Sequence, residues 1–521
     1  MTTSTSTTHG SAGTTTRCDV AVVGYGPVGK VAAGFLSRAG HSVTVVEKHP
    51  SVFPLPRAGH LDHEVMRIMQ DLGCAAEVSA VTTVARRYEL LDADHHVLAR
   101  LPRTWVAPSG WDASYHFYQP DLETALDAHV QTLDIDVRSS YEAVDVTQDD
   151  EGVHLTVRDS AGEQHTVHAR YLVGADGANS FVRESVMPGW EDLGFRAEWL
   201  VIDVELPTAA QRPDIPDTAQ VLDPRRPHHM ALLNHRVVRW EFMLLPDDDP
   251  AAIQTPESVW ELLSSWVTPD SATLLRHVVY SFRSGMAQRW RAGRVLLAGD
   301  AAHLMPPFLG QGMCSGIRDA ATVAWMLDRV LRGSSREDVL NAYQASRAPH
   351  VREYITESMR IGQVVCETDP ARSAEQGRRL AAAPEDAPFE PRIGPGVLGG
   401  ESPDAGHLSV QPLFRGSSGA SVRLDDVTGG GFTLVTQAGA GTGLGSGARR
   451  SLAELGVQVV DPEAFAAQHD LIMVDNSVGA WLDRHDAVAA LVRPDFYVFD
   501  FAHGWDDLNG LLDDLGAQLC T

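Results

Sequence analysis

Short apolar runs early in the chain end in glycine-rich turns. Asp19–Val23 leads directly into the turn Gly24–Gly29, and a helix is predicted from there to Gly40, a natural C-cap. A second apolar run, Ser42–Val46, ends at Glu47. The pattern therefore predicts a strand, a helix and a second strand.

The glycine spacing of the first turn is typical of a dinucleotide site. Gly24 permits the tight turn, Gly26 lets a pyrophosphate approach the backbone, and Gly29 lets the helix pack closely on the sheet. Glu47 is placed to accept hydrogen bonds from a ribose diol. The alternative is a fortuitous turn without a ligand, but the acidic residue at the end of the second strand favours a dinucleotide site.

A similar pattern recurs between residues 295 and 331. Val295–Ala298 is predicted to be a buried strand, Asp300 lies at its carboxyl end, and a helix is predicted from Met313 to Leu331. Between them, Gly310–Gly312 leaves several backbone N–H groups free at the start of the helix. Such a helix start binds negative charge. By itself, the pattern indicates an anion-binding strand, turn and helix.

A third apolar run ends in Asp176-Gly177, and the three motifs together resemble a known family. This is the single-component FAD-dependent aromatic hydroxylases of the para-hydroxybenzoate hydroxylase fold. The chain is most similar to the 3-(3-hydroxyphenyl)propionate hydroxylase group and its polyketide-tailoring relatives. The resemblance covers about residues 17–390 and, more weakly, the tail. The matching segments are Gly24–Gly29, Pro56–Ala58, Tyr118–Glu123, Asp176-Gly177, Gly299–His303, Pro306-Pro307 and Gly310–Asp319.

The resemblance implies bound FAD, with NADH or NADPH as a transient co-substrate. Asp300 would bond the ribityl hydroxyls, and Arg57 and Gln119 would line the same chain. The Gly310–Met313 amides would stabilise negative charge on the reduced ring. Pro306 and Pro307 would flank the ring without adding N–H groups. The implied cofactor-binding residues are Gly24, Gly26, Pro27, Gly29, Glu47, Lys48, Arg57, Gln119, Asp176, Asp300, Gly310, Gly312 and Met313.

The resemblance also implies a reaction, although spacing identifies no catalytic residue. An FAD-dependent monooxygenase would use NAD(P)H and O₂, through a flavin C4a-hydroperoxide, to hydroxylate a phenolic or aromatic substrate. Two alternatives stay open: a polyketide-tailoring monooxygenase that performs epoxidation or Baeyer–Villiger insertion, and a non-catalytic flavin-binding protein. The glycines of 439–445, with Asp461 after them, do not match a second nucleotide motif and are interpreted as a loop.

Alternating apolar and polar positions between residues 190 and 282 predict an antiparallel sheet that roofs a substrate pocket. Part of 80–120 is expected to contribute to this pocket. The candidate substrate residues are Tyr115, His116, Trp240 and Phe242, although core packing explains the aromatic ones equally well. Candidate phenol-side bases, each with a structural alternative, are His60, His63, His116, His228, His229 and His235. His303 is expected to have a structural role.

These elements indicate an α/β fold with α+β elements. We expect a disordered tail at 1–16 and a Rossmann-like FAD-binding domain at 17–189 and 283–390. The inserted substrate-binding sheet would occupy 190–282. A linker and a thioredoxin-like domain would occupy 391–521, and without a CxxC motif that domain cannot exchange disulfides.

Composition narrows the function classes. The 521 residues carry a formal net charge of −27, which argues against nucleic acid or an anionic membrane as a partner. Five scattered cysteines without CxxC spacing predict neither a metal site nor a disulfide framework. The Ser/Thr-rich start lacks the apolar region of a signal peptide, and no apolar stretch is long enough to span a membrane. We therefore expect a cytoplasmic enzyme, compatible with a homodimer.

Overall fold

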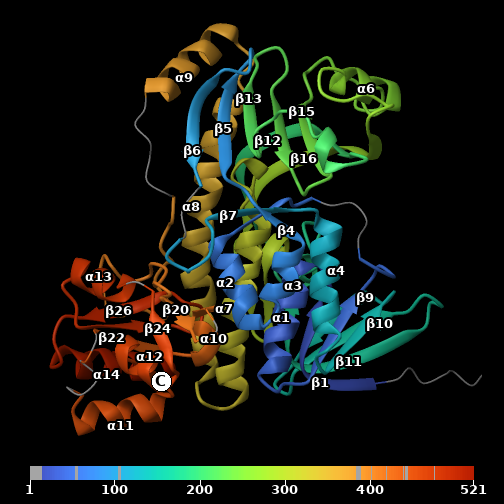
Figure 1. Cartoon of the computed structure of the whole chain (residues 1–521). Helices are drawn as coiled ribbons and strands as arrows, with labels where there is room; N and C mark the ends of the chain where they lie inside the picture. Colours follow the sequence, from blue (N-terminus) through green and yellow to red (C-terminus); the bar gives the residue numbers. More distant parts are fainter. Residues whose placement is uncertain are drawn as a thin grey trace, which may run out of the picture.

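The computed structural model describes residues 15–52, 57–103, 107–382, 389–400, 402–417, 419–437, 439, 444–474 and 476–520. Figure 1 shows three regions: a lower α/β region, an antiparallel sheet above it, and a C-terminal region at the lower left. The long helix α8 (Asn341–Val365) passes between the first two regions. Most of the predicted tail, residues 1–14, and Pro56 lie outside the described residues.

The lower region is built on a mostly parallel sheet with the strand order β17-β18-β11-β1-β2-β8, to which β10 and β9 are added. Its centre, β1 (Thr15–Val23), pairs in parallel with β2 (Val43–Glu47) and β11 (Gln164–Gly174). The tail was predicted to reach residue 16, but Thr15 and Thr16 already pair with β11. The remaining strands are β8 (Ile135–Ser139), β9 (Glu142–Gln148), β10 (Val153–Arg158), β17 (Arg291–Ala292) and β18 (Val295–Leu297).

Helices α1 (Pro27–Arg38) and α7 (Gly312–Leu331) pack against each other over this sheet. The predicted turn glycines have clear steric reasons. Gly24 has a φ of +103°, and a Cβ on Gly29 would lie 2.0 Å from the Gly24 carbonyl oxygen. The other helices of the lower region are α2 (His63–Leu72), α3 (Ala75–Ala80), α4 (Gln119–Val130) and α5 (Phe181–Val186). Helix α9 (Pro370–Ala382) lies beside the upper sheet, as Figure 1 shows.

Short elements connect the lower region to the upper one. A three-stranded sheet of β3 (His60–Asp62), β7 (Ser114–Phe117) and β4 (Thr82–Val84) lies between them. The turns after β18 contain the 3-10 helices η2 (Gly299–Ala301) and η3 (Pro307–Leu309). Two further 3-10 helices are η1 (Ala209–Gln211) and η4 (Glu337–Leu340).

The upper sheet has the strand order β19-β16-β12-β15-β14-β13-β5-β6 and is mostly antiparallel. It extends beyond the predicted range 190–282, because β5 and β6 come from residues 87–102 and β16 continues to Ala287. Helix α6 (Pro256–Leu263) covers the hydrophobic core on one face of this sheet. Its strands are β5 (Arg87–Asp92), β6 (Val97–Pro102), β12 (Trp190–Glu205), β13 (Thr218–Leu222), β14 (His228–Leu232), β15 (Val237–Met243), β16 (Thr273–Ala287) and β19 (His303–Leu304).

The C-terminal region contains a four-stranded sheet with the order β23-β22-β25-β26, in which only the β22–β23 pair is parallel. Its strands are β22 (Thr433–Thr436), β23 (Gln458–Val460), β25 (Ala489–Val492) and β26 (Val498–Ala502). A smaller sheet consists of β20 (Leu413–Gly416), β21 (Ser421–Arg423) and β24 (Leu471–Met473). The helices are α10 (Asp425–Thr428), α11 (Ser446–Leu455), α12 (Pro462–Gln468), α13 (Ser477–Arg484) and α14 (Asp507–Cys520).

Strand β26 starts only at Val498, because Arg493–Tyr497 forms a turn in which Phe496 has a φ of +69°. Most of the glycine loop at 439–445 lies outside the described residues. Within the described part of the chain, every helix is too short or too polar to cross a bilayer.

Substitution of Gly29 should destabilise the lower region, whereas the same change at Gly26 should not. A Cβ at Gly29 meets backbone at 2.0 Å, but a Cβ at Gly26 meets nothing within 4 Å. We expect Gly29→Ala to lower the free energy of unfolding by about 1–3 kcal/mol, the usual cost of overpacking. Gly26→Ala is the control, and thermal unfolding measures both. Equal melting temperatures for the two variants would contradict this packing.

Candidate active site

A cavity of about 540 Å³ lies where the lower parallel sheet meets the upper sheet. Turns that follow β1, β11 and β18 line its lower side, including Gly26, Gly177 and Asp300. These strands are neighbours in one parallel sheet, and their carboxyl ends share an edge, where open α/β sheets bind ligands. Side chains of the upper sheet line the opposite side, and the segment Met305–Gly310 also lines the cavity.

The first glycine turn opens into the cavity at Gly26. Helix α1 starts there without a side-chain cap, so its first N–H groups are available to a ligand. Glu47 fixes the turn, because its carboxylate accepts hydrogen bonds from the backbone N–H groups of Tyr25 and His49, both at 2.8 Å. Lys48 is exposed and does not line the cavity.

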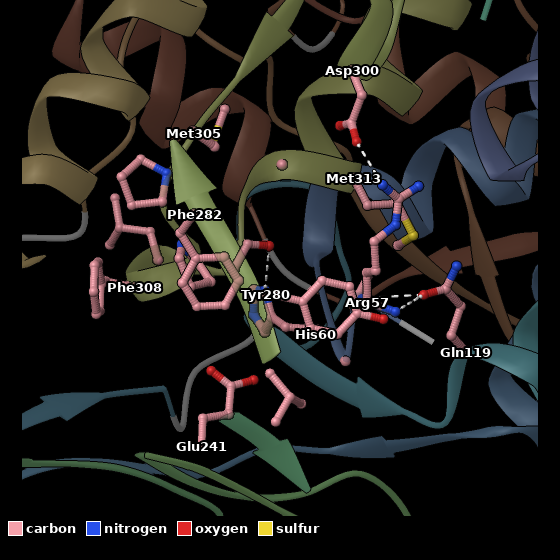
Figure 2. Close-up of a pocket in the computed structure, with 18 of the residues that line it drawn as sticks. Arg57, His60, Gln119, Glu241, Tyr280, Phe282, Asp300, Met305, Phe308 and Met313 are labelled. Atoms are coloured by element: carbon pink, nitrogen blue, oxygen red, sulfur yellow. Dashed lines mark hydrogen bonds and ion pairs between the residues drawn. The ribbon is translucent and has the colours of Figure 1, made fainter. Parts of the chain in front are cut away.

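Arg57 is held at the cavity from two sides, as Figure 2 shows. Its guanidinium lies 3.4 Å from the Asp300 carboxylate. Its backbone N–H, and that of Ala58, donate to the Gln119 side-chain oxygen at 2.6 and 2.9 Å. The Gln119 amide in turn donates to Glu123, which forms a buried ion pair with Lys30. Gln119 therefore positions the segment that carries Arg57.

Asp176 was predicted to contact the cofactor, but its carboxylate is turned away from the cavity. It accepts hydrogen bonds from the Ser180 hydroxyl and from the Val182 N–H, at the start of α5. Burial raises the pKa of this carboxyl group. Its neighbours Ala175 and Gly177 line the cavity in its place. Asp176 thus orders the turn, and the residues around it face the ligand space.

The turn Gly310–Met313 is fixed by a buried polar network. Gln311 donates to Asp62 at 2.9 Å and accepts from the Arg318 guanidinium at 2.9 Å. Arg318 is 2% exposed and forms ion pairs with both Asp62 and Glu64. Burial alone would raise the pKa of Asp62, but Arg318 holds it well below its usual range. The Tyr497 hydroxyl of the C-terminal region donates to Glu64.

A second network fixes the turn that carries Asp300. The buried Asp319 carboxylate accepts hydrogen bonds from the Gly299 N–H at 3.1 Å and the Arg347 guanidinium at 2.9 Å. The His303 Nε2 lies 2.7 Å from the same carboxylate, and both side chains are fully buried. His303 does not line the cavity, and its contact with Asp319 lies behind the turn.

The two prolines form part of the cavity wall with Met305 and Phe308. The carbonyl oxygen of Pro306 accepts a hydrogen bond from Ser358 at 2.6 Å. The carbonyl oxygen of Phe308 accepts one from the Tyr88 hydroxyl at 2.7 Å. Both carbonyls are therefore satisfied by the protein, and this wall presents apolar surface. Trp199, Val201, Leu233 and Phe282 add further apolar surface from the upper region.

The polar part of the upper wall was missed from the sequence. On β15, Arg239 and Glu241 face the cavity, and Arg239 forms a buried ion pair with Asp203 at 2.7 Å. Arg276 pairs with the other oxygen of Asp203 at 2.9 Å. The signal was present as charged residues at alternate positions of an otherwise apolar strand.

The same alternation overturns three predicted substrate contacts. Trp240 and Phe242 project to the opposite face of β15, where they join the core under α6. Tyr115 is buried in the lower core, and its hydroxyl accepts a hydrogen bond from the Asp112 N–H. None of the three lines the cavity, whereas the fourth candidate, His116, does.

Among the candidate histidine bases, His60, His116 and His229 line the cavity, and His63, His228 and His235 do not. His60 lies 3.3 Å from the Gly310 carbonyl oxygen and 2.9 Å from the Arg103 guanidinium. Arg103 also donates to Ser114 at 2.6 Å and lies over the Tyr88 ring. The described residues place no carboxylate within ion-pair distance of Arg103.

Three histidines with a lowered pKa predict a loss of stability in mild acid. Burial, with Arg103 beside two of them, lowers the pKa of His60 and His116 to about 3, and burial lowers that of His228 to about 4. In the unfolded chain these groups take up protons below about pH 6.5. The unfolded state therefore binds more protons than the folded state between about pH 6.5 and 4, and stability falls with pH across that window.

We expect His116→Gln to reduce this pH dependence, because it removes one of the three titrations. Urea unfolding at pH 7 and pH 5 measures the difference in unfolding free energy for each variant. His96→Gln is the control, since the His96 side chain is 78% exposed. The interpretation is wrong if wild type, H116Q and H96Q all lose the same stability between the two pH values.

The described residues contain no group of histidine, cysteine and acidic side chains arranged to hold a metal ion.

Comparison with known proteins gives two family matches. Residues 17–358 match the family model described as an FAD binding domain. Residues 406–518 match the model described as the HcaD C-terminal domain. The first match covers most of the lower and upper regions, and the second match covers the C-terminal region.

Two curated relatives align over nearly the whole chain. A probable NADH-specific resorcinol 4-hydroxylase from Rhodococcus jostii is 38% identical over 96% of this chain and 95% of its own length. A 3-(3-hydroxy-phenyl)propionate/3-hydroxycinnamic acid hydroxylase from Burkholderia cenocepacia is 33% identical over 92% of this chain and 93% of its own.

Solved structures with a similar fold have lower sequence identity. The flavin-dependent monooxygenase PieE, in complex with FAD and substrate, has a TM-score of 0.77 at 23% identity, over 96% of this chain and 99% of its own. Aklavinone-11 hydroxylase, with FAD and aklavinone, has a TM-score of 0.76 at 22% identity, over 96% and 98%. At this level of identity, the likeness shows the fold alone.

Proposed function

The chain belongs to the FAD-dependent aromatic hydroxylases, and on that premise we propose that it uses NADH to hydroxylate a small phenol. Its fold is the mixed α/β fold of FAD-binding monooxygenases, with an HcaD-like C-terminal domain. One observation carries the proposal: a single cavity joins the dinucleotide turns to a pocket with one apolar wall and one polar wall. This arrangement brings a cofactor and an aromatic ring together.

The residues of the lower wall fit FAD. The space that a Cβ on Gly26 would enter is free of protein atoms, as a close approach of pyrophosphate to the backbone requires. Glu47 stands at the end of β2, where a ribose diol would reach it. Pro27, Gly24 and Gly29 shape the turn, and Lys48 contributes only from the exposed rim. Asp176 would contribute indirectly, because it orders the turn whose residues Ala175 and Gly177 line the cavity.

The remaining cofactor contacts follow from the turn after β18. Asp300 and Arg57 would bond the ribityl chain, with Gln119 holding the Arg57 segment. The N-terminus of α7, at Gly312 and Met313, would stabilise negative charge on the ring. FAD, once reduced by NADH, supplies the oxygen chemistry. Pro306 and Pro307 would cover the ring and exclude water.

The names of the two curated relatives give different phenols as substrates. Arg103 bears on which kind of phenol this chain would bind more tightly. Its guanidinium lines the cavity, lies over the Tyr88 ring and has no carboxylate partner among the described residues. A cation that is partly shielded from water and has no counter-charge is costly, and an anionic substituent on the substrate would lower that cost. We therefore expect a phenol with a carboxylate side chain to bind more tightly than resorcinol.

The domain boundaries and the C-terminal topology also belong to this proposal. The sequence ranges 17–189 with 283–390, 190–282 and 391–521 would be the cofactor, substrate and C-terminal domains. The strand order β23-β22-β25-β26, with one parallel pair, is the arrangement of a thioredoxin-like domain. Because the chain has no CxxC motif, this domain would serve packing, including contacts in a homodimer.

Substrate-stimulated oxidation of NADH tests the function. We expect the FAD-loaded protein to oxidise NADH faster in the presence of 3-(3-hydroxyphenyl)propionate or resorcinol, with one oxygen atom added to an intact ring. The carboxylate-bearing phenol should show the lower KM, because Arg103 offers a counter-charge. NADPH in place of NADH is the comparison for the reductant, and mass spectrometry identifies the product.

Three outcomes would contradict parts of this proposal. A ring-opened or epoxidised product would favour the polyketide-type reactions. No stimulation by any phenol, with reducible bound flavin, would favour a flavin-binding protein. A lower KM for resorcinol would remove the role given to Arg103.

Replacement of Asp300 by alanine tests the cofactor site. It should remove charged hydrogen bonds worth about 1.5–3 kcal/mol and so weaken the Kd for FAD by about 10- to 160-fold. Titration of the apoprotein with FAD measures the Kd, and circular dichroism checks the fold. Asp338→Ala is the control, because Asp338 is 72% exposed and does not line the cavity. Unchanged FAD affinity in D300A would exclude this contact.

A further inference from the structure

Three polar side chains form a row across the upper wall of the cavity. The strand register places Gln220 of β13 opposite His229 of β14, and His229 opposite Glu241 of β15. All three line the cavity, on the face of the sheet opposite Trp240. In Figure 2 the Glu241 carboxylate points from its strand into the space below Tyr280 and Phe282. This row is the polar counterpart of the wall at Pro306 and Pro307.

Two atoms of this row are buried without a hydrogen-bond partner among the described residues. They are the side-chain oxygen of Gln220 and the Nδ1 of His229. Gln220 is 3% exposed, and its amide group lies 3.4 Å from the Tyr88 hydroxyl. An unsatisfied buried polar atom costs about 1–3 kcal/mol, so such atoms mark places where a ligand completes the bonding. A ring hydroxyl can both donate and accept a hydrogen bond, as this pair of atoms requires.

Two guanidiniums and two carboxylates lie next to this row. Arg239 and Arg276 both pair with the carboxylate of Asp203. The Glu241 carboxylate lies 3.8 Å from the Arg239 guanidinium. If Glu241 accepts a proton from the substrate, Arg239 is close enough to stabilise negative charge on the oxygen that gave up the proton.

We propose that Glu241 accepts the proton of the substrate's ring hydroxyl while His229 and Gln220 hold that hydroxyl in place. This inference rests on the proposed function. The ring carbon receives a hydroxyl group whose oxygen comes from O₂, with NADH supplying two electrons through FAD and the second oxygen atom leaving as water. As this C–O bond forms, the O–H bond of the substrate's own hydroxyl breaks, its proton bonds to a Glu241 oxygen, and the substrate oxygen becomes a carbonyl. The substituted ring carbon then loses its own proton to water. The ring oxygen takes a proton back from Glu241, which restores the carboxylate.

The other titratable groups that face Glu241 are less suited to this step. Tyr280 accepts a hydrogen bond from Arg276 at 3.4 Å, and a neutral tyrosine hydroxyl is a poor base. Burial lowers the pKa of His229 and of His116, so neither imidazole holds a proton well. Asp203 is committed to two guanidiniums. Among the described carboxylates of the upper wall, this leaves Glu241 to accept the proton.

The test compares Glu241→Gln with Glu205→Gln in the FAD-loaded full chain. Glu205 lies at the end of β12 on the same sheet, pairs with Arg236 and does not line the cavity. With 3-(3-hydroxyphenyl)propionate, E241Q should form product about 10²- to 10⁴-fold more slowly, the usual contribution of a general base. FAD content and the rate of flavin reduction by NADH should match wild type. E205Q should resemble wild type in every respect.

A change in the acidity of the phenol separates proton transfer from a structural role. A fluorinated analogue whose hydroxyl is already ionised at the assay pH needs no base, so E241Q should lose much less activity with it. Raising the pH toward the ionisation of the parent phenol should also restore E241Q activity. A loss that is the same for both phenols at every pH would overturn the proton-transfer role.

Three further outcomes distinguish failure of this inference from failure of the proposed function. Wild-type product formation in E241Q would overturn the inference and leave the proposed function intact. If wild type converts no phenol, the proposed function itself fails, and this inference fails with it. If E241Q does not retain FAD, His229→Gln replaces it. That variant should raise the KM for the phenol about tenfold with unchanged flavin reduction, and an unchanged KM would overturn the inference.

Discussion

The buried guanidinium of Arg318 is the interaction on which the cavity depends. It binds two carboxylates of the segment Asp62–Glu64 and the side chain of Gln311, and so ties α2 to the turn before α7. Buried ion pairs add little net stability, but removal of one partner leaves an uncompensated charge. The network therefore favours one position of the turn over all others. Through Tyr497 it also includes the C-terminal region, 433 residues away from Glu64 in sequence.

The next residue along α7, Asp319, holds the other side of the cavity floor. The Asp319 carboxylate accepts a hydrogen bond from the Gly299 N–H and contacts the Nε2 of the His303 ring. It also accepts a hydrogen bond from Arg347 of α8. Consecutive residues of one helix thus position the turn that carries Asp300 and the turn that contains Gly310. Neither turn has regular structure long enough to keep its shape alone. Their geometry comes from α7, which is buried along most of its length.

Local patterns in the sequence predicted the βαβ unit and the two glycine-rich turns, because glycine spacing and apolar runs act over a few residues. They also predicted that an antiparallel sheet would roof the pocket. They did not predict which side of a strand faces the cavity. Trp240 was chosen for its aromatic ring, but the neighbouring charged positions 239 and 241 face the ligand space. The partners of Arg318 and Asp319 were also missed, since those contacts join residues far apart in the chain.

The two faces of strand β15 place different constraints on amino-acid substitution. Its even-numbered side chains build the core under α6, and its odd-numbered side chains 239 and 241 build the wall of the cavity. Substitutions at the even-numbered positions are constrained by packing of the core. Substitutions at positions 239 and 241 are constrained by the chemistry of the ligand. A lineage could therefore acquire a new substrate through changes on one side of this strand while the opposite side stays fixed. Directed evolution of the enzyme can use the same division by randomising only positions 239 and 241 of this strand.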